Sequence, residues 1–294
     1  MTDISWADRI ELFQYALTAS LLAGLVCPLV GVFLLVRRTS FYGIALPQFA
    51  TAGVVFGFVV LPFWVEHFGL AGLTVDQALT DTHAAMNYHL AWAAVFTFGG
   101  LLALVFTGRG QSSEVGRVAA AFAIATAATY LFGRMSPVGK GHGDELMQGE
   151  VLGIGRHELE TLAAVFGFVL LVLVWFHRDL VLASYDRETA RVLGKRVTAT
   201  EALLNLLTGL TVSAGTMTLG PTMLFGLLVL PPLAARRWSS SMTRFFLFSS
   251  ALGVLAVVAG IGASFQFDLP LGPAIVGAAA LELVPGALLG KRKG

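Results

Sequence analysis

The feature that most constrains this chain is a succession of long apolar runs separated by short polar breaks. Each run approaches the roughly 20 residues that an α-helix needs to cross the hydrocarbon of a bilayer. The runs are continuous and do not alternate between polar and apolar residues, so they predict helices and not the strands of a barrel. With 56% hydrophobic and only 13% charged residues, the chain lacks the balance of a water-soluble domain. We therefore predict an all-α, polytopic membrane protein.

About nine membrane-spanning helices are predicted by this length criterion. No polar block between them is long enough to fold separately, so we expect a single transmembrane domain over residues 1–294. Nothing in the sequence resembles a nucleic-acid-binding module, and the partner that the composition implies is the lipid bilayer. The predicted spans are Glu11–Val36, Ile44–Val65, Leu90–Thr107, Val118–Phe132, Glu158–Phe176, Glu201–Met217, Pro221–Ala235, Phe245–Ala263 and Leu271–Leu289.

The positions of Lys and Arg predict the orientation, because basic residues are retained in cytoplasmic loops. Most of the 19 basic residues follow the first, third, fifth, seventh and ninth predicted spans. This bias requires an odd number of spans, with the N-terminus outside and the C-terminus in the cytoplasm. The sequence thus predicts a multi-pass protein of the cell (inner) membrane.

Prolines and glycines inside the predicted spans indicate where the helices bend or pack closely. Pro28, Pro47 and the pair Pro231–Pro232 predict broken helices, whose freed backbone groups must be satisfied by neighbouring helices or by a water-filled cavity. Gly53 and Gly57 form a GxxxG step, which allows another helix to approach closely. We expect this step to serve helix packing.

A short charged segment, "SYDRETARVLGKRV" at 184–197, lies between the fifth and sixth predicted spans. Ser184 or Asp186 is suited to cap a helix N-terminus, and Gly194 is suited to end that helix. Ala190 and Leu193 lie at helical spacing and predict a small apolar ridge rimmed by charge. Because the segment is too short and too polar to cross the bilayer, we place it at the cytoplasmic surface. It is either a solvated linker helix or a docking element for a cytoplasmic subunit.

Four stretches, in this order along the chain, carry a resemblance to a known family. They are "GVFLLVRRTSFYGIALPQFATAGVVFGF", "LVLASYDRETARVLGKRVTATEALLNLL", "LGPTMLFGLLVLPPLAARRWS" and "SFQFDLPLGPAIV". The second is similar to the coupling segment of the metal-ion ABC importer permeases, which handle zinc, manganese or iron, and Asp186, Glu188, Ala190 and Gly194 match its pattern. The chain is identified as a divergent member of that family.

The resemblance implies that the chain is the membrane-spanning permease subunit of an ATP-binding-cassette importer for a divalent metal ion. Two permeases would pair around a central pathway, and a soluble extracytoplasmic binding protein would deliver the cargo. A separate cytoplasmic ATPase would dock on a coupling helix at about 184–197. The chain has no GxxxxGK[ST] phosphate loop, so we expect ATP hydrolysis on another chain, no catalytic residue in this one and no cofactor. The residues expected to couple to the ATPase are Asp186, Glu188, Ala190, Leu193 and Gly194.

The second predicted span departs from the family pattern. Members that carry zinc or manganese usually show "GD.LAHA" there, with Asp and His as metal ligands on one helical face. This chain reads "GIALPQFA", which places Ile44 and Gln48 at those two positions, and Gln48 offers only a neutral oxygen. Ser213 and Asp268 are further pathway candidates. An importer of a chelated metal or another small solute therefore remains an alternative.

Metal ligands are also sought in the loops predicted to lie outside. His83, His89, His142 and Asp144 could capture a divalent cation there, although solvated loop residues are the alternative. Two hypotheses come from other classes: an intramembrane enzyme and a non-transporting membrane scaffold. The enzyme is disfavoured because the sequence contains neither HExxH nor GxSxG and has no acidic residue at the centre of a predicted span.

Overall fold

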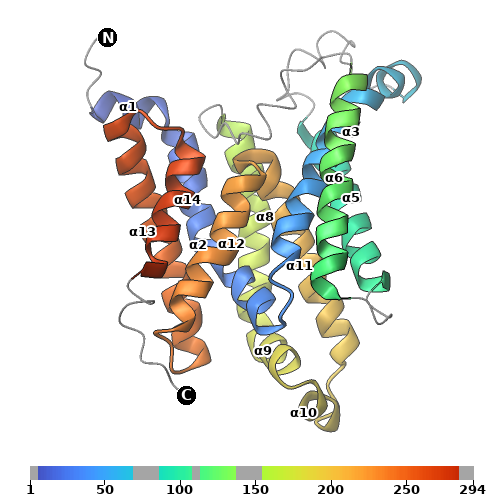
Figure 1. Cartoon of the computed structure of the whole chain (residues 1–294), viewed down its shortest axis with the longest axis vertical. Helices are drawn as coiled ribbons and strands as arrows, with labels where there is room; N and C mark the ends of the chain where they lie inside the picture. The colour runs from blue at the N-terminus through green and yellow to red at the C-terminus, as the bar shows by residue number, and fades with distance from the viewer. Residues whose placement is uncertain (1–5, 69–85, 108–112, 137–153, 285–294) are drawn as a thin grey trace.

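The structure, a computed structural model, describes residues 6–68, 86–107, 113–136 and 154–284. These residues form α-helices joined by turns, and no β-strand occurs among them. The long helices stand side by side in a single bundle (Figure 1). The prediction of an all-α protein is therefore confirmed.

Within the described residues, seven helices are long and apolar enough to cross a membrane, and two apolar helices, α12 and α14, are shorter. Three more, α1, α9 and α10, are short helices at the ends of the bundle. The bounds are α1 Trp6–Leu12, α2 Gln14–Val36, α3 Tyr42–Phe68, α5 Met86–Thr107, α6 Glu114–Met135, α8 Arg156–Trp175, α9 His177–Tyr185, α10 Arg187–Val192, α11 Val197–Leu219, α12 Pro221–Arg236, α13 Met242–Phe267 and α14 Leu271–Leu281.

Each of the nine predicted spans overlaps one of these apolar helices, but only seven of the helices reach spanning length. The 16 residues of α12 rise about 24 Å, which is less than the roughly 30 Å thickness of the hydrocarbon. Gly220 separates α11 from α12 with a φ of 78°, a conformation that glycine adopts without steric cost. The end of the ninth predicted span, Leu289, lies outside the described residues. The count of nine spans and the orientation of the termini therefore stay predictions.

The expectation that prolines break the helices is wrong. α2 is continuous through Pro28, α3 through Pro47, and α12 through the pair Pro231–Pro232. A proline removes one N–H and its ring crowds the carbonyl four residues earlier, but neighbouring helices stabilise such helices in a membrane. Pro47 lies near the start of α3, where the N–H that it lacks would have bonded the carbonyl of Gly43.

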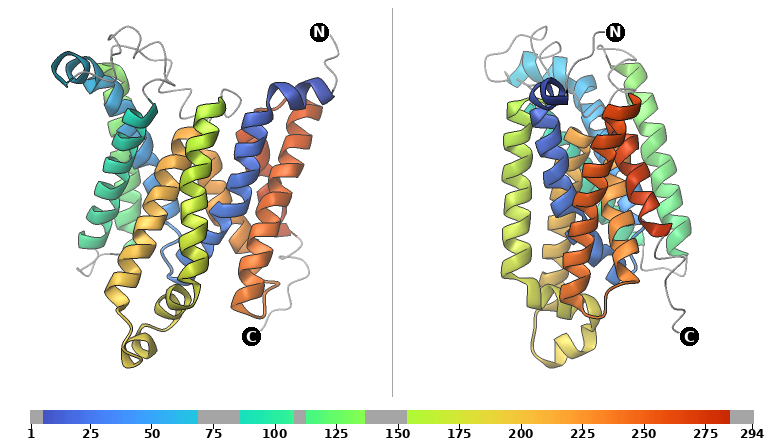
Figure 2. Two further views of the ribbon diagram at one scale, coloured as in Figure 1. Left: turned by 180° about the vertical axis from the view of Figure 1, so that it is seen from behind. Right: turned by 90° about the vertical axis from the view of Figure 1, so that its left-hand side faces the viewer.

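The bundle has a buried centre and an exposed periphery. In α2, α3 and α11, 67% of the most apolar stretch is buried, against 17% in α6. α3 packs on α5 and α6, and α2 packs on α12 and α13 (Figure 2). The predicted GxxxG contact is confirmed, because an added Cβ would lie 2.4 Å from the carbonyl oxygen of Trp92 at Gly53 and 2.9 Å from Nδ1 of His89 at Gly57.

One end of the bundle carries a protrusion. α9 and α10 extend below the other helices in Figure 1, between the lower ends of α8 and α11. We refer to residues 177–196, which comprise α9, α10 and the turn that follows, as the tip. The ends of α2, α12 and α11 that carry Arg37, Arg236 and Arg196 face the same side of the bundle.

Candidate functional site

The tip contains the helix that the sequence predicts. Of the two predicted caps, Asp186 caps it, whereas Ser184 lies within α9. Asp186 leaves the helical conformation, with a φ of −140°, and so separates α9 from α10. The backbone N–H of Thr189 donates to Asp186 Oδ1 at 2.9 Å, and the Thr189 hydroxyl donates to Oδ2 at 2.6 Å. These bonds from the Thr189 hydroxyl and N–H hold the pKa of Asp186 below its ordinary value, because they stabilise the charged carboxylate.

Gly194 ends the helix, also as expected. Its φ of 72° lies in the left-handed region. The N–H of Gly194 donates to the carbonyl of Arg191 at 2.9 Å, and the N–H of Lys195 donates to the carbonyl of Ala190 at 3.0 Å. This pair of bonds is the Schellman motif, which satisfies the last carbonyls of a helix and requires a left-handed residue at this position. Both ends of α10 are thus fixed by local hydrogen bonds.

Of the two residues predicted to form an exposed apolar ridge, Leu193 is exposed but Ala190 is buried. Ala190 is fully buried, packed with Ala183 of α9 and Val197 of α11 in a small cluster separate from the main core. Leu193 is 62% exposed, as predicted, and Val192 is 86% exposed beside it. The short Ala190 side chain turns inward because α9 and α11 converge behind α10, an arrangement that the helical spacing alone does not contain.

Ion pairs hold the tip together. Glu188 pairs with Arg191 on the exposed face of α10, with Oε1 and Nη1 2.6 Å apart. Lys195 Nζ lies 2.9 Å from Asp179 Oδ1 and so joins the turn after α10 to α9. These pairs are exposed, so each is expected to contribute only about 0–1 kcal/mol. They set the orientation of the tip more than its stability.

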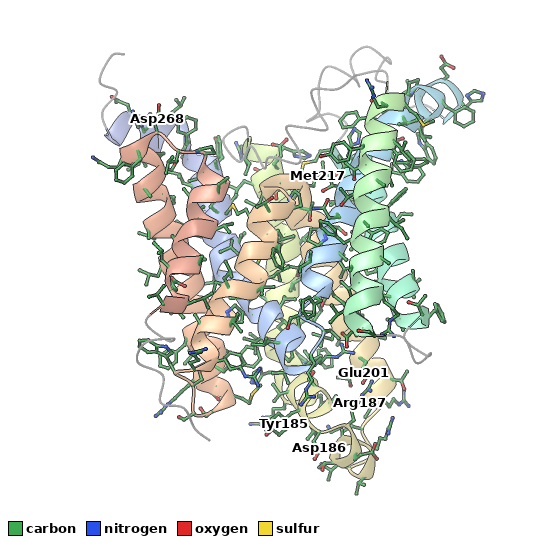
Figure 3. All side chains as sticks on the ribbon, viewed as in Figure 1. Tyr185, Asp186, Arg187, Glu201, Met217 and Asp268 are labelled. Atoms are coloured by element: carbon green, nitrogen blue, oxygen red, sulfur yellow. The ribbon has the colours of Figure 1, made fainter. Side chains whose placement is uncertain are left out.

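A further set of charged residues links the tip to the bundle, and the sequence analysis missed it. Arg187 of α10 pairs with Glu201 of α11 (Figure 3). Arg37, at the end of α2, donates from Nη1 to Asn205 Oδ1 of α11 at 3.2 Å. Burial lowers the pKa of Arg37, and the charge of nearby Glu201 opposes that shift. Glu201, the first residue of the sixth predicted span, was the available signal, since a carboxylate at the edge of a membrane helix is commonly paired with a cation.

The three pathway candidates differ in their exposure and in their hydrogen bonds. Ser213 is buried, and its hydroxyl donates to the carbonyl of Gly209 at 2.8 Å, an ordinary bond within its own helix. Asp268 is exposed at the end of the bundle opposite the tip, where it ends α13 with a left-handed φ of 54° (Figure 3). The Gln48 Oε1 atom is buried and accepts no hydrogen bond from the described residues. Of the three, Gln48 alone holds a polar atom whose burial calls for a partner.

Only one of the four weak metal candidates is among the described residues. His83, His142 and Asp144 lie outside the described residues. His89 is within α5 and not in a loop, and it is fully buried, with its ring centroid 4.0 Å from that of Phe58. The predicted span began at Leu90, where the apolar run begins, whereas α5 begins one turn earlier at Met86. Among the described residues, no group of three or more His, Cys, Asp and Glu side chains is placed to hold a metal ion.

Comparison with known proteins gives matches along almost the whole chain. The model of the ABC 3 transport family matches residues 9–289. The manganese transport system membrane protein MntC of Halalkalibacterium halodurans is 27% identical over 268 residues, which cover 90% of this chain and 82% of that protein. The chelated iron transport system membrane protein YfeD of Yersinia pestis is 26% identical over 271 residues, covering 92% and 83%.

A solved structure has a similar fold. The structure titled "PsaBC from Streptococcus pneumoniae in complex with Fab" contains a chain that superposes with a TM-score of 0.78 at 20% identity. The superposition covers 98% of this chain and 96% of that one. At this identity the likeness establishes the shared helical arrangement. It therefore supports the order and packing of the helices from α2 to α14.

Proposed function

This chain belongs to the ABC 3 transport family, and from that premise we propose that it is the permease subunit of an importer for manganese or iron. The observation that carries the proposal is the family match, which extends over residues 9–289 and thus includes every apolar helix described in full. The chain is a multi-pass protein of the cell (inner) membrane. ATP hydrolysis falls to a separate cytoplasmic ATPase, and a soluble binding protein presents the cargo from outside.

The tip is the proposed docking site for the ATPase. It projects beyond the bundle, its helix α10 is fixed at both ends, and it exposes Tyr185, Val192 and Leu193 to 77%, 86% and 62%. Charged side chains of Glu188 and Arg191 border this apolar surface. Exposed apolar residues within a polar rim are typical of protein interaction sites. Asp186, Ala190 and Gly194 would act by shaping α10, whereas Leu193 would contact the partner.

Docking is tested by measuring the ATPase activity that co-purifies with the tagged permease from its native membrane. Leu193→Asp is expected to lower the co-purified activity at least about tenfold, because a charge would be buried in an apolar contact. The control is Leu269→Asp, a change of an exposed leucine at the opposite end of the bundle, which should retain the activity. Equal loss in both variants, or loss in neither, would contradict docking at the tip.

The orientation that docking requires places the tip in the cytoplasm. The described basic residues at the ends of α2, α11 and α12 support it, because they gather on the side of the tip. Leu193→Cys is expected to react with a membrane-impermeant maleimide only after the cells are opened. Cys27, the only native cysteine, is fully buried and gives little background. Labelling of Cys at position 193 in intact cells would reverse the topology.

The cargo proposal is tested by elemental analysis. A strain lacking the protein is expected to contain less manganese or iron than its parent under starvation for that metal. Restoring the gene should restore the metal content, and restoring the Leu193→Asp variant should not. A deficit confined to zinc would identify zinc as the cargo instead. Unchanged contents of all three metals would contradict metal import.

A chelated metal is the second candidate cargo, and two observations favour it. Gln48 presents a neutral buried oxygen, and the described residues provide no cluster of ionisable ligands that would replace the water around a bare ion. One relative, YfeD, also carries chelated iron in its name. Vesicles that contain the complete importer should then accumulate the radiolabelled metal more rapidly with a chelator than without it. The opposite ranking would favour the free ion.

Pairing of two permeases is proposed through α6, the least buried of the long helices. Its outward face carries Gly116, Ala120, Ala123 and Ala127, all exposed. These small residues recur every three or four positions and so form a continuous stripe on one side of the helix. Such stripes allow close contact between helices in membranes, where lipid offers no hydrophobic drive to association.

Cross-linking tests this pairing in a Cys27→Ser background. Ala120→Cys is expected to give a disulfide-linked dimer on mild oxidation. The control is Ala164→Cys on α8, an exposed alanine on a different face, which should stay monomeric. A dimer formed through position 164 and not through position 120 would place the interface elsewhere.

A further inference from the structure

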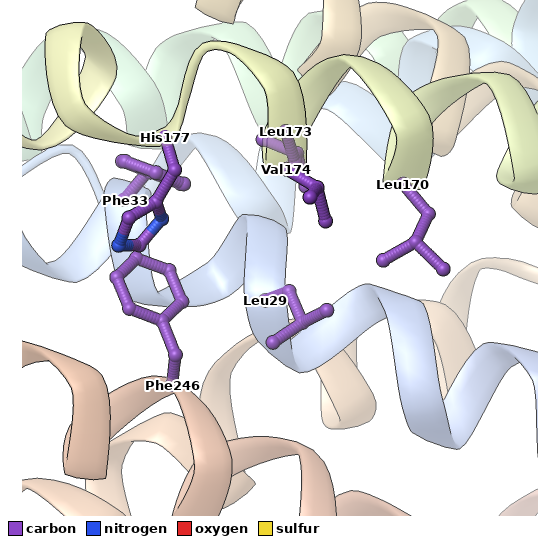
Figure 4. Close-up of a pocket in the computed structure, with 7 residues that line it drawn as sticks. All are labelled: Leu29, Phe33, Leu170, Leu173, Val174, His177 and Phe246. Atoms are coloured by element: carbon purple, nitrogen blue, oxygen red, sulfur yellow. The ribbon is translucent and has the colours of Figure 1, made fainter.

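A cavity of about 290 Å³ lies near the end of the bundle that carries the tip, beside the junction of α8 and α9. It is bounded by α2, by α8 where it passes into α9, and by α13 (Figure 4). Its walls are almost wholly apolar and include Leu29, Phe33, Leu170, Leu173 and Phe246. A hydrated ion or a polar solute would lose its hydrogen bonds in such a space, whereas a hydrocarbon chain would lose none.

A second cavity, of about 380 Å³, adjoins the first and differs in character. The two share Val174 and His177, so they meet where α8 ends. Trp175, Arg178 and Asp179 line the second cavity. Trp175 is 79% exposed, and exposed tryptophans of membrane proteins concentrate at the level of the lipid headgroups. The apolar cavity therefore opens into the polar second cavity, at the depth of the lipid headgroups.

The charge at this mouth is positive. Asp179 is compensated by Lys195, whose Nζ is 2.9 Å from its carboxylate. Arg178 is exposed and forms no ion pair within the described part of the chain. His177 is half-buried, with its ring edge-on to Phe246 at a centroid distance of 5.0 Å, and so closes the boundary between the two cavities. An anionic group placed here would meet an arginine and no uncompensated carboxylate.

We propose that these two adjoining cavities bind one anionic phospholipid. One of its two acyl chains fills the apolar cavity between α2, α8 and α13, and its phosphate lies against Arg178. The apolar part excludes a free inorganic anion as the preferred ligand, and the cationic mouth favours an anionic over a zwitterionic headgroup. The site lies at the junction of α8 and α9, directly before the tip, so an occupied site stabilises the start of α9. This inference does not depend on the cargo or on the ATPase.

The binding is tested with the purified full-length protein by native mass spectrometry, with phosphatidylglycerol and phosphatidylcholine of identical acyl chains as probes. The unchanged protein is expected to bind phosphatidylglycerol about fivefold more tightly, the increment of one basic residue at a membrane surface. Arg178→Gln should abolish this preference. The matched control is Arg134→Gln, at the far end of α6, which should retain it.

Filling the cavity tests the position of the acyl chain. Leu170→Trp is expected to lower the affinity for both lipids at least about tenfold, because each methylene excluded from the cavity contributes about fourfold to partitioning. Leu171→Trp introduces the same ring on the 62% exposed neighbouring residue and should leave both affinities unchanged. Should Leu170→Trp prove unfolded by its melting temperature, Val174→Trp, at the 69% exposed edge of the cavity, replaces it.

The outcomes that overturn the proposal are equally specific. Equal affinity for the two lipids in the unchanged protein would remove the role of Arg178. Unchanged affinity in Leu170→Trp or Val174→Trp would place the acyl chain elsewhere. Inorganic phosphate that competes with phosphatidylglycerol at equal concentration would reduce the site to an anion site.

Discussion

The centre of the bundle and the tip are held together by different forces. In the centre, α2 and α13 approach so closely that a Cβ added to Gly253 would lie 2.2 Å from the carbonyl oxygen of Gly24. Hydroxyls buried there, such as those of Thr208 and Thr211, donate to carbonyls of their own helix. In the tip, caps and ion pairs determine the geometry, and only Ala190 anchors α10 by burial.

This difference teaches where each region is vulnerable. Contacts between backbones tolerate no added atom, but they depend little on pH or salt. Caps and exposed ion pairs tolerate changes of volume and respond to charge and ionic strength. A region that must grip a partner and transmit a movement can therefore vary in sequence at its surface while the bundle stays rigid.

The largest effect is expected at the closest helix contact. Gly253→Val should destabilise the protein by about 3 kcal/mol, because its Cβ would overlap the Gly24 carbonyl and lie 2.5 Å from the Pro28 ring. Gly262→Val is the control on the same helix, since an added Cβ there meets nothing within 4 Å. The thermal unfolding midpoint in detergent measures both. Equal unfolding midpoints in the two variants would show that a glycine at a helix contact is no more sensitive than one with open space beside it.

A smaller and local effect is expected at the end of α10. Gly194→Val should cost about 1–2 kcal/mol, because a β-branched residue is strained at a φ of 72° although the added atoms meet nothing. The amides of residues 187–192 should exchange faster with deuterium, while those of α11 stay protected. Gly194→Asn, which tolerates this conformation better, should lose less protection. A general loss of protection in α11 would contradict the independence of tip and bundle.

The link between the two regions should contribute still less. Glu201→Gln removes the partner of Arg187 and the charge near Arg37, and we expect a loss of about 1 kcal/mol that shrinks at high salt. Glu188→Gln is the matched control, because the Glu188–Arg191 pair lies on the solvent side and should contribute almost nothing. Unfolding midpoints at two salt concentrations distinguish the cases. A larger loss of stability in Glu188→Gln than in Glu201→Gln would show that the Arg187–Glu201 pair does not join the tip to the bundle.

The smallest effect is a pH dependence of α10. The folded pKa of Asp186 is lowered, so its stabilisation is present above the unfolded pKa of about 3.9 and is lost as pH falls through the lower folded pKa. Amide protection of residues 187–192, corrected for intrinsic exchange, should be constant from pH 7 to 5 and fall below about pH 4. Asp186→Asn retains a capping side chain and should remove the dependence. A fall already at pH 6 would implicate another group.

The tip was predicted well where its structure is local. Asp186 and Gly194 act on backbone groups within a few residues, so the sequence contains the whole interaction. The burial of Ala190 and the pair of Arg187 with Glu201 could not be predicted in the same way, because they depend on how α9, α10 and α11 converge. The continuity of α3 through Pro47 was also missed, because the sequence shows a helix breaker there but not the helices α5, α6 and α12 that pack on α3.

The order of the residues is enough to specify a bundle of membrane helices with a capped polar helix between two of them. Apolar length and hydrogen-bonding caps are properties of consecutive residues, and they act in any tertiary context. Only the tertiary structure decided which glycines meet a neighbouring backbone, which face of α10 turns outward, and where α2, α8 and α13 leave a cavity. These features arise where helices cross, and crossing depends on the fit of side chains from separate segments.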